Sequence, residues 1–494
     1  MLHHQKKIRR GIVALALVVA LALPGAALAG NFTELQTIID NTPAGGTIVL
    51  SEDYAFVSPD DAPAIYRMIS DDNGDDFNAS GLSIDKAITI DGNGMTLSGA
   101  GEIRVLYIDG IGVDGDALVL KNVTVTKGGK VGSGSGIYIA RGNKVDFAKS
   151  SIKENGTVSG VHTRDGGSIF IDSKSVVSFD DCDIVSNLGA DRAAGIYTRG
   201  NVTITNSRIK DNVGGSRGGG IYVDPGYKSP ERGGEWGGNL TIKDSVLTGN
   251  KGGRGGALYI NPENTTRNTI ENCIIKSNDV SANNVGNGGG IVFYNCVASV
   301  ISCDIGDNAA KRGGGLIVDV LSDVTIDRCT ITGNTVTGAA SEDQNIGGGI
   351  LCHDGSHSDD TMKPIGVIRL KNSTVTGNKR SEETSGANRA ADDLANDVHI
   401  HWSTNADKSL DKDPNWTARY DGSIASGGNN VIGTLVNPKN FTVGDGDKIS
   451  SQTYDLPADH PDLPRHSSSS SSGCSTGTAF FALAGALLCF MKRR

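Results

Sequence analysis

One short pattern recurs eight times between residues 150 and 378, and it restricts the chain to a stacked architecture. The pattern is Cys or Ser, any residue, an aliphatic residue, two further residues and then Asn, as in Cys182 to Asn187. Loops of variable length separate the copies, which is typical of a β-solenoid because helical repeats hold a fixed period. The asparagines are Asn155, Asn187, Asn212, Asn250, Asn278, Asn308, Asn334 and Asn378.

A second motif precedes each copy and consists of small residues, mostly Gly, followed by an aliphatic residue, as in Gly218 to Ile221. The chain holds 68 Gly, about twice the usual share. Gly adopts positive φ cheaply and lets the next coil approach to about 4.8 Å. We expect each repeated Asn to occupy a left-handed turn and to bond to its copy in the next coil. Alternating segments such as Ile221-Tyr222-Val223 predict strands with one buried face.

The paired motifs resemble the Gly-Gly-Ala-Ile and Phe-x-x-Asn repeats of the polymorphic outer-membrane proteins of chlamydiae, with Ile, Val or Leu here in place of Phe. They also resemble the wider pectin-lyase-like superfamily, over roughly residues 130–380. The resemblance implies an all-β fold, a right-handed single-stranded parallel β-helix, at the cell surface and often with adhesive roles.

The N-terminal residues 1–29 predict a secretory signal peptide that is cleaved after Ala29. A basic start precedes an apolar run from Gly11 to Leu23, and a retained membrane anchor is the alternative. Residues 32–40 then predict an amphipathic helix, with Thr33 and Gln36 as a capping box. We expect this helix to cap the solenoid, because an open end exposes unpaired strand edges.

The C-terminal residues predict a linker and an anchor. Residues 455–473 are rich in Pro and Ser, and residues 474–494 hold an apolar stretch that ends in Lys492-Arg493-Arg494. The stretch is near the lower length limit for a transmembrane helix. With Gly473 and Cys474 before it, this tail resembles bacterial sorting signals of the Synergistes type, which implies processing at that motif. A plain membrane helix is the alternative.

The segments described above also set the boundaries of the regions between the two ends of the chain. Residues 30–129 are expected to hold the N-terminal cap and the first coils, and residues 130–380 the repeat-rich β-helix. Residues 381–454 are expected to form the last irregular coils or a lower cap.

The cysteines and possible metal ligands predict no cofactor. Four cysteines share one repeat position with four serines, so a small side chain matters there, and no pair has the Cys-x-x-Cys spacing of a zinc site. The four cysteines are Cys182, Cys273, Cys303 and Cys329. Stacked free thiols and one disulfide are both open for the last three, which fall in consecutive coils.

Two polar clusters are candidate metal sites. The run Asp71 to Asp76 offers oxygen ligands but lacks the spacing of a calcium loop, so we expect a solvated loop, with Ca²⁺ as the alternative. His399 and His401 share one face of a predicted strand, and we expect surface or cap residues rather than a metal pair.

The net charge of the chain limits the classes of ligand that it can bind. The formal net charge is −10, and seven basic residues lie in the two ends, so the body is more acidic still. This excludes nucleic acid as a partner, because its binding needs a basic surface. We predict an exported adhesin or envelope structural protein, either attached to the cell surface or outer membrane or released from it. Its expected partners are the cell envelope, through the tail, and host-surface or polysaccharide ligands.

The alternative function is an extracellular polysaccharide lyase or glycosidase. It requires carboxylates, or carboxylates with Arg or Lys, that converge around residues 180–350. Asp183, Asp304 and Asp327 are candidate acids, and no local motif singles them out.

Overall fold

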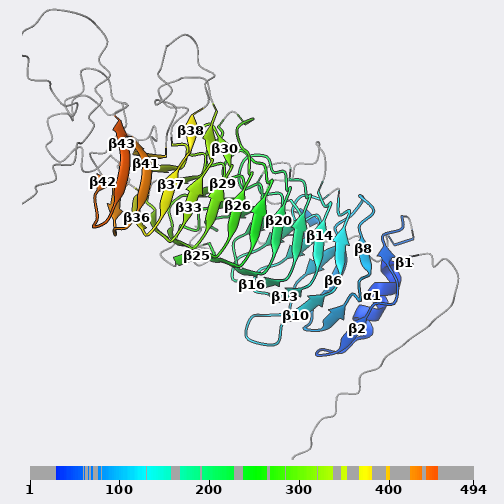
Figure 1. Cartoon of the computed structure of the whole chain (residues 1–494). Helices are drawn as coiled ribbons and strands as arrows, with labels where there is room; N and C mark the ends of the chain where they lie inside the picture. Colours follow the sequence, from blue (N-terminus) through cyan, green and yellow to red (C-terminus); the bar gives the residue numbers. More distant parts are fainter. Residues whose placement is uncertain are drawn as a thin grey trace, which may run out of the picture.

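The chain winds into coils that stack along one axis in the computed structural model of the protein (Figure 1). The structure describes residues 29–453 except 59, 62–64, 66–67, 71–75, 79, 130, 157–166, 190–191, 227–236, 264–266, 284, 320, 338–346, 353–365, 381–396, 401–422 and 437–440. One coil contains three short strands, as in β18 (Ile196–Thr198), β19 (Asn201–Thr205) and β20 (Arg208–Lys210). Corresponding strands of successive coils pair in parallel and build three long sheets, which confirms the predicted parallel β-helix.

Sheet A carries the repeated Cys/Ser-to-Asn pattern. Its strands are β1 (Gly30–Asn31), β3 (Tyr54–Ala55), β8 (Thr96–Ser98), β11 (Thr124–Thr126), β14 (Ser151–Lys153), β17 (Asp183–Val185), β20, β23 (Val246–Thr248), β26 (Ile274–Lys276), β29 (Asp304–Gly306), β33 (Thr330–Thr332), β37 (Thr374–Thr376), β41 (Val431–Val436) and β43 (Lys448–Thr453).

Sheet B lies between the other two along each coil. Its strands are β2 (Thr47–Val49), β7 (Thr89–Asp91), β10 (Leu118–Lys121), β13 (Lys144–Ala148), β16 (Val176–Asp180), β19, β22 (Leu240–Lys243), β25 (Arg267–Glu271), β28 (Val297–Ile301), β32 (Asp323–Asp327), β36 (Val367–Lys371), β40 (Ser423–Ser426) and β42 (Phe441–Thr442).

Sheet C follows the Gly-rich motif of each coil. Its strands are β6 (Leu82–Ile84), β9 (Leu106–Ile108), β12 (Ile137–Ile139), β15 (Ile169–Ile171), β18, β21 (Ile221–Val223), β24 (Leu258–Ile260), β27 (Ile291–Phe293), β31 (Leu316–Val318), β35 (Ile350–Cys352) and β39 (Val398–Ile400). Sheets A and C join where β39 pairs with β41.

Two small sheets complete the described strands. The parallel strands β30 (Ala309–Ala310), β34 (Thr335–Val336) and β38 (Lys379–Arg380) form one, and the antiparallel strands β4 (Met68–Ser70) and β5 (Asp76–Asn78) form the other.

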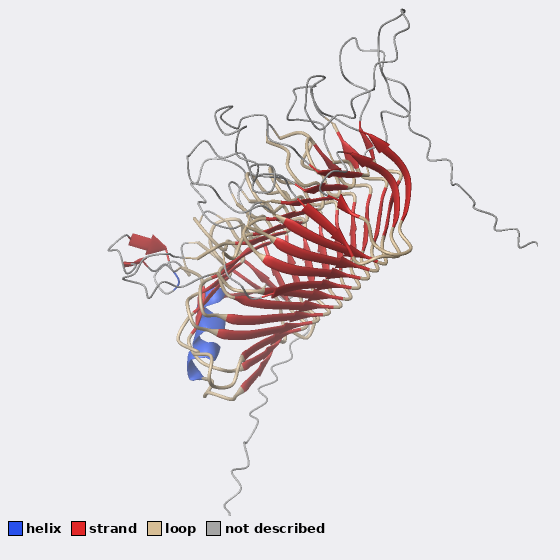
Figure 2. Ribbon diagram, turned by 90° about the vertical axis from the view of Figure 1, so that its left-hand side faces the viewer, coloured by secondary structure: helices blue, strands red, loops and turns tan. Residues whose placement is uncertain are grey.

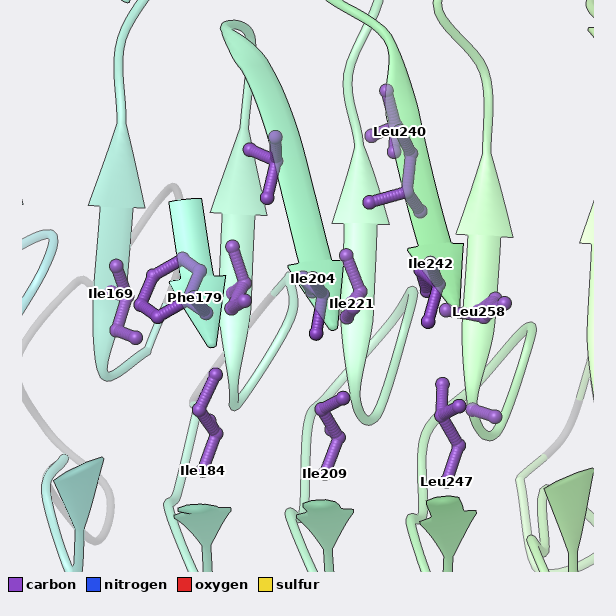
Figure 3. Packing of buried hydrophobic residues seen from close by; sticks show 14 of the residues in the cluster. Ile169, Phe179, Ile184, Ile204, Ile209, Ile221, Leu240, Ile242, Leu247 and Leu258 are labelled. Carbon is purple, nitrogen blue, oxygen red and sulfur yellow. The ribbon is translucent and has the colours of Figure 1, made fainter. Parts of the chain in front are cut away.

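The core fills the space that the three sheets enclose. Alternate residues of each strand point inward, and equivalent aliphatic residues of successive coils pack on one another (Figure 3). Ile184, Ile209 and Leu247 form one such row, and each is fully buried. Aromatic rings stack in the same way, with the centroids of Phe147 and Phe179 4.8 Å apart. One continuous apolar core therefore runs along the solenoid, as the strand alternation predicts.

Each coil bends at two left-handed residues, and these are not the repeated asparagines. One lies before the Cys/Ser position, as at Asp181 (φ 54°) and Asn206 (φ 51°). The other lies directly before the repeated Asn, as at Ser186 (φ 54°) and Asp211 (φ 54°). The expectation that the repeated Asn itself adopts the left-handed conformation is wrong, because its preceding neighbour makes the turn.

The Gly-rich motif allows neighbouring coils to approach. A Cβ atom added to Gly290 would lie 2.5 Å from the carbonyl oxygen of Gly315 in the next coil. That oxygen belongs to the backbone of a paired coil and cannot move aside. Gly218, at the start of its motif, supplies a positive φ of 57° as well.

The one helix in the described part of the chain, α1 (Phe32–Asn41), lies at one end of the solenoid (Figure 2). Its buried residues Phe32, Leu35 and Ile39 join the core. Asn31 and Glu34 form the capping box, so the expected box of Thr33 and Gln36 is wrong. The hydroxyl of Thr33 instead donates to Asp61, and the Gln36 side chain bonds to the backbone of Ser83.

Candidate functional site

The eight repeated asparagines form one buried ladder beside sheet A. In each step, the Nδ2 and backbone N–H of one Asn donate to Oδ1 of the next, as from Asn250 to Asn278 at 3.0 Å each. The ladder ends on Asp397, whose Oδ1 accepts both bonds from Asn378 at 2.8 Å. Burial raises the pKa of Asp397 above its ordinary value. Because the asparagines are buried and mutually bonded, they serve the stack rather than a ligand.

The four cysteines of the repeat are buried free thiols. Hydrogen bonds to the thiols of Cys273 and Cys329, together with burial, raise the pKa of Cys303. Burial also raises the pKa of Cys182 to about 11. All four thiols are buried, so this row is a packing feature of the corner.

The candidate acids do not converge. The carboxylate of Asp183 pairs with Arg208, and that of Asp304 with Lys276 at 2.6 Å, both on the outer face of sheet A. Asp327 pairs with Arg328 on sheet B. Each acid therefore meets a cation in its own or an adjacent coil, which is typical of a balanced scaffold surface.

Several predicted sites fall at or beyond the limits of the described residues. Ala29 is exposed at the start, whereas Gly473, Cys474, Asp71 to Asp75 and His401 lie outside the described residues. Within those residues, no three His, Cys, Asp or Glu side chains gather as metal ligands. The same residues include no helix long and apolar enough to cross a membrane.

A different cluster lies on the outer face of sheet C, where sequence reasoning placed no site. The middle residue of each strand points away from the core, and from β9 to β24 these residues stack as an aromatic row. Tyr138 and Phe170 stack at 4.7 Å, Phe170 and Tyr197 at 5.1 Å, and Tyr197 and Tyr222 meet edge to face at 5.3 Å. The aromatic row is Tyr107, Tyr138, Phe170, Tyr197, Tyr222 and Tyr259.

An arginine row runs alongside from the coil of Tyr197 onward, five residues before the middle residue of each sheet C strand. Arg192 Nη1 lies 3.4 Å from the Tyr197 hydroxyl, and Arg217 Nη1 donates to the Tyr222 hydroxyl at 3.2 Å. The backbone of Arg192 pairs with that of Arg217, and the backbone of Asn287 pairs with those of Arg254 and Arg312, which places one side chain per coil. Burial raises the pKa of Tyr222, so the phenol keeps its proton and receives the guanidinium. The arginine row is Arg192, Arg217, Arg254, Asn287 and Arg312.

A polar row lies on the other side, two residues after the aromatic row. Its centre is Arg199, whose Nε donates to Asp224 at 3.2 Å and whose Nη1 lies 3.9 Å from Asp172. Arg199 also donates to the Tyr197 hydroxyl at 2.9 Å, and Arg192 reaches Asp224 at 3.4 Å. Arg199 and Asp224 are each only 5% exposed. From β15 to β31 the polar row is Asp172, Arg199, Asp224, Asn261, Tyr294 and Asp319.

These three rows carry a sequence signal that was missed. Arg, four residues, Tyr, one residue and then Arg, Asp or Asn occurs at Arg192, Arg217 and Arg254. The motif spans the Gly-rich turn and a strand, and its Arg192 contacts Asp224 of the next copy. We name the surface that the rows form the arginine–tyrosine face.

Comparisons with known proteins bear on the fold. Residues 80–261 match the family model of the right-handed β-helix region. A structure titled as a PL6 alginate lyase complex with trisaccharide is 13% identical, covering 86% of this chain and 82% of that chain, at a TM-score of 0.37. The periplasmic alginate epimerase AlgG is 14% identical, covering 83% and 84%, at a TM-score of 0.27. No curated protein sequence matches. The family model and the parallel coils together assign the chain to the right-handed parallel β-helix fold.

Proposed function

We propose that this protein is exported and binds an extended acidic polysaccharide along the arginine–tyrosine face, as a surface adhesin or envelope-binding protein. The observation that carries the proposal is the arginine row, in which Arg192, Arg217 and Arg254 lie in three successive coils beside the ordered tyrosines. Coils repeat about every 4.8 Å, close to the length of one sugar unit in an extended chain. A carboxylated polymer could therefore meet successive guanidiniums without changing register.

The chemistry of the row suits carboxylates. Guanidinium binds carboxylate through two parallel hydrogen bonds, and one bond to a tyrosine leaves further N–H donors on each arginine. Arg192 is 32% exposed at its side chain, so its outer edge is accessible to a ligand. The tyrosines below are buried and hold the guanidiniums in place, which lowers the entropy lost on binding.

Charge supports the same ligand. Over the three rows, five arginines accompany three aspartates, whereas the whole chain has a net charge of −10. An acidic polymer is repelled by most of the surface and attracted to this face. The electrostatic field of the protein therefore directs an acidic polymer to the arginine–tyrosine face.

The binding test compares matched pairs of arginines. We expect Arg217→Gln/Arg254→Gln to bind polygalacturonate at least tenfold more weakly than the wild type, by roughly 1.4 kcal/mol or more. The control Arg208→Gln/Arg369→Gln removes the same charge from the outer faces of sheets A and B, where both side chains are exposed. Equal losses in both variants, or no wild-type binding in calorimetry at low salt, would contradict the proposal.

Export and anchoring need a separate test. The predicted signal at residues 1–29 and the predicted sorting tail at 474–494 support display outside the cell. Protease shaving of intact host cells should release a fragment of roughly residues 30–460. Recovery of the intact chain from the cytosol would contradict this part of the proposal.

A second candidate function is polysaccharide cleavage, and the cluster of Asp172, Arg199 and Asp224 favours it. Two carboxylates and a guanidinium converge there beside Tyr197, as the enzyme hypothesis requires. Lyase activity would produce unsaturated uronates, which are detected by their ultraviolet absorbance. Hydrolysis would instead produce new reducing ends. Products that form with the wild type and vanish with Asp224→Asn would establish the enzyme, and intact polymer after prolonged incubation would exclude it for that substrate.

A further inference from the structure

The arginine row has a fixed register, because a backbone hydrogen bond joins the turn of each member to the next coil. The N–H of Ala193 donates to the carbonyl oxygen of Arg217 at 2.8 Å, and that of Gly218 to the carbonyl oxygen of Arg254 at 2.7 Å. The remaining two bonds run from Gly255 to Asn287 at 2.8 Å and from Gly288 to Arg312 at 2.9 Å. The row therefore advances by one coil per member without a shift in register.

The side chains of the row are accessible along its whole length. The Arg192 side chain is 32% exposed, and each of the other four members is partly exposed. Since one coil advances by about 4.8 Å, the row covers about 19 Å from Arg192 to Arg312. With one sugar unit per coil, about five units lie along it.

The fourth position of the row carries no charge. Three arginines fill the first three positions, and Asn287 separates them from Arg312. The coil of Asn287 also lacks a phenol, because the middle residue of β27 is Val292. A sugar unit opposite Asn287 therefore meets no guanidinium in its own coil, whereas the units on either side of it do.

The sequence offers no further arginine at either end of the row. Five residues before Phe170 it has Asp165, and five residues before Leu351 it has Ile346, both outside the described residues. An acid and an aliphatic side chain supply no cation for a carboxylate. The number of positions is thus limited to the five of the row.

We propose that the arginine row binds one stretch of about five uronate units, in which the unit opposite Asn287 needs no carboxylate. This inference rests on the proposed function of the arginine–tyrosine face and adds the length of the site and its pattern of charge. The ligand class is a uronate oligosaccharide, or a stretch of a longer uronate polymer, that tolerates a neutral or esterified sugar at its fourth unit.

The length of the site is measured by calorimetry at low salt with galacturonate oligomers, from the dimer to the octamer. We expect the affinity to rise by about fivefold for each unit that gains an arginine, to change little from trimer to tetramer, and to level off at the pentamer. Arg312→Gln should move the plateau to the trimer and leave trimer binding unchanged, because the three arginines before Asn287 remain. The control Arg208→Gln removes the same charge from the outer face of sheet A and should keep the plateau at the pentamer.

The neutral position is tested by adding the missing cation. Asn287→Arg should bind the tetramer and the pentamer about fivefold more tightly than the wild type does, and should turn the small step from trimer to tetramer into a full one. The control Asn201→Arg adds the same charge at an exposed position of sheet B, away from the row. It should leave the dependence of affinity on length unchanged.

The outcomes separate this inference from the proposed function. If the wild type binds neither the oligomers nor polygalacturonate, the proposed function fails. If the wild type binds but its affinity keeps rising beyond the pentamer, or if Arg312→Gln leaves the plateau in place, the five-unit site is refuted and the arginine row stands. A gain from Asn287→Arg no larger than that from Asn201→Arg would refute the neutral fourth position. The length series of the wild type needs no variant, so it decides the length of the site even if a variant does not fold.

Discussion

Replacing one asparagine in the middle of the ladder should destabilise the solenoid strongly. Asn278 is fully buried, and its Oδ1 accepts two bonds from Asn250. Its Nδ2 lies 3.0 Å from the carbonyl oxygen of Leu247 and 2.9 Å from Oδ1 of Asn308. Asn278→Ala therefore leaves the backbone N–H of Asn250 and one of its two amide N–H groups without an acceptor, because only the other still reaches the Ile209 carbonyl. It also leaves the Leu247 carbonyl without this donor.

The size of the effect follows from those unmet groups. Each buried polar group that loses its partner costs about 1–3 kcal/mol, so we expect a loss of about 3–6 kcal/mol in the free energy of unfolding. Stability in a solenoid is carried by contacts between neighbouring coils, so the damage should concentrate near this step. Backbone amides around Asn250 and Asn308 should then exchange hydrogen faster than those near α1.

The assay is urea unfolding followed by circular dichroism, with hydrogen exchange to locate the change. Asn201→Ala is the control, because Asn201 is exposed on β19 and should change the free energy of unfolding by no more than about 1 kcal/mol. If the two variants unfold at the same urea concentration, the ladder does not hold the coils together and the reasoning is refuted.

Three further changes test the packing and the buried groups. Gly290→Ala should cost about 1–3 kcal/mol or more in urea unfolding, whereas Gly115→Ala, with open space around its Cβ, should cost about 0.5 kcal/mol at most. Burial raises the pKa of Cys296 to about 12, so at pH 8 Ellman's reagent should label it only after unfolding, and rapid native labelling would contradict the burial. The folded chain holds the proton of Asp397 more tightly than the unfolded chain does, so the free energy of unfolding should fall as pH rises from about 4 through the raised pKa. Asp397→Asn should remove that decline in the free energy of unfolding. A variant with the same pH profile as the wild type would contradict this role of Asp397.

The sequence predicted the fold because the coil constraints are local. The Cys/Ser-to-Asn pattern encloses one turn and one strand, and the turn needs only a small residue and an amide at fixed spacing. The strand expected at Ile221-Tyr222-Val223 is present as β21. The capping box was misplaced by two residues because its hydrogen bonds depend on Asp61, which competes for Thr33 and lies 28 residues away. The tertiary contact between Thr33 and Asp61 therefore determines which of the two adjacent capping boxes forms.

The arginine–tyrosine face was missed because its order arises between coils. Tyr197 has the sequence position of an exposed strand residue, yet it is fully buried. Phe170 stacks on one side of its ring, Tyr222 packs edge to face on the other, and Arg199 covers it. Variable loops separate these residues in sequence, so no fixed period reveals them.

Pairing distinguishes this face from the rest of the surface. The acids first considered as candidates each meet a cation at most one coil away, which cancels the field there. In the arginine row, Arg192 and Arg217 lie against neutral phenols, which orient a guanidinium without removing its charge, and Arg192 also meets Asp224 at 3.4 Å. A solenoid that only needed solubility would gain nothing from ordering cations in register. This arrangement favours a repeating, negatively charged ligand over a purely structural role.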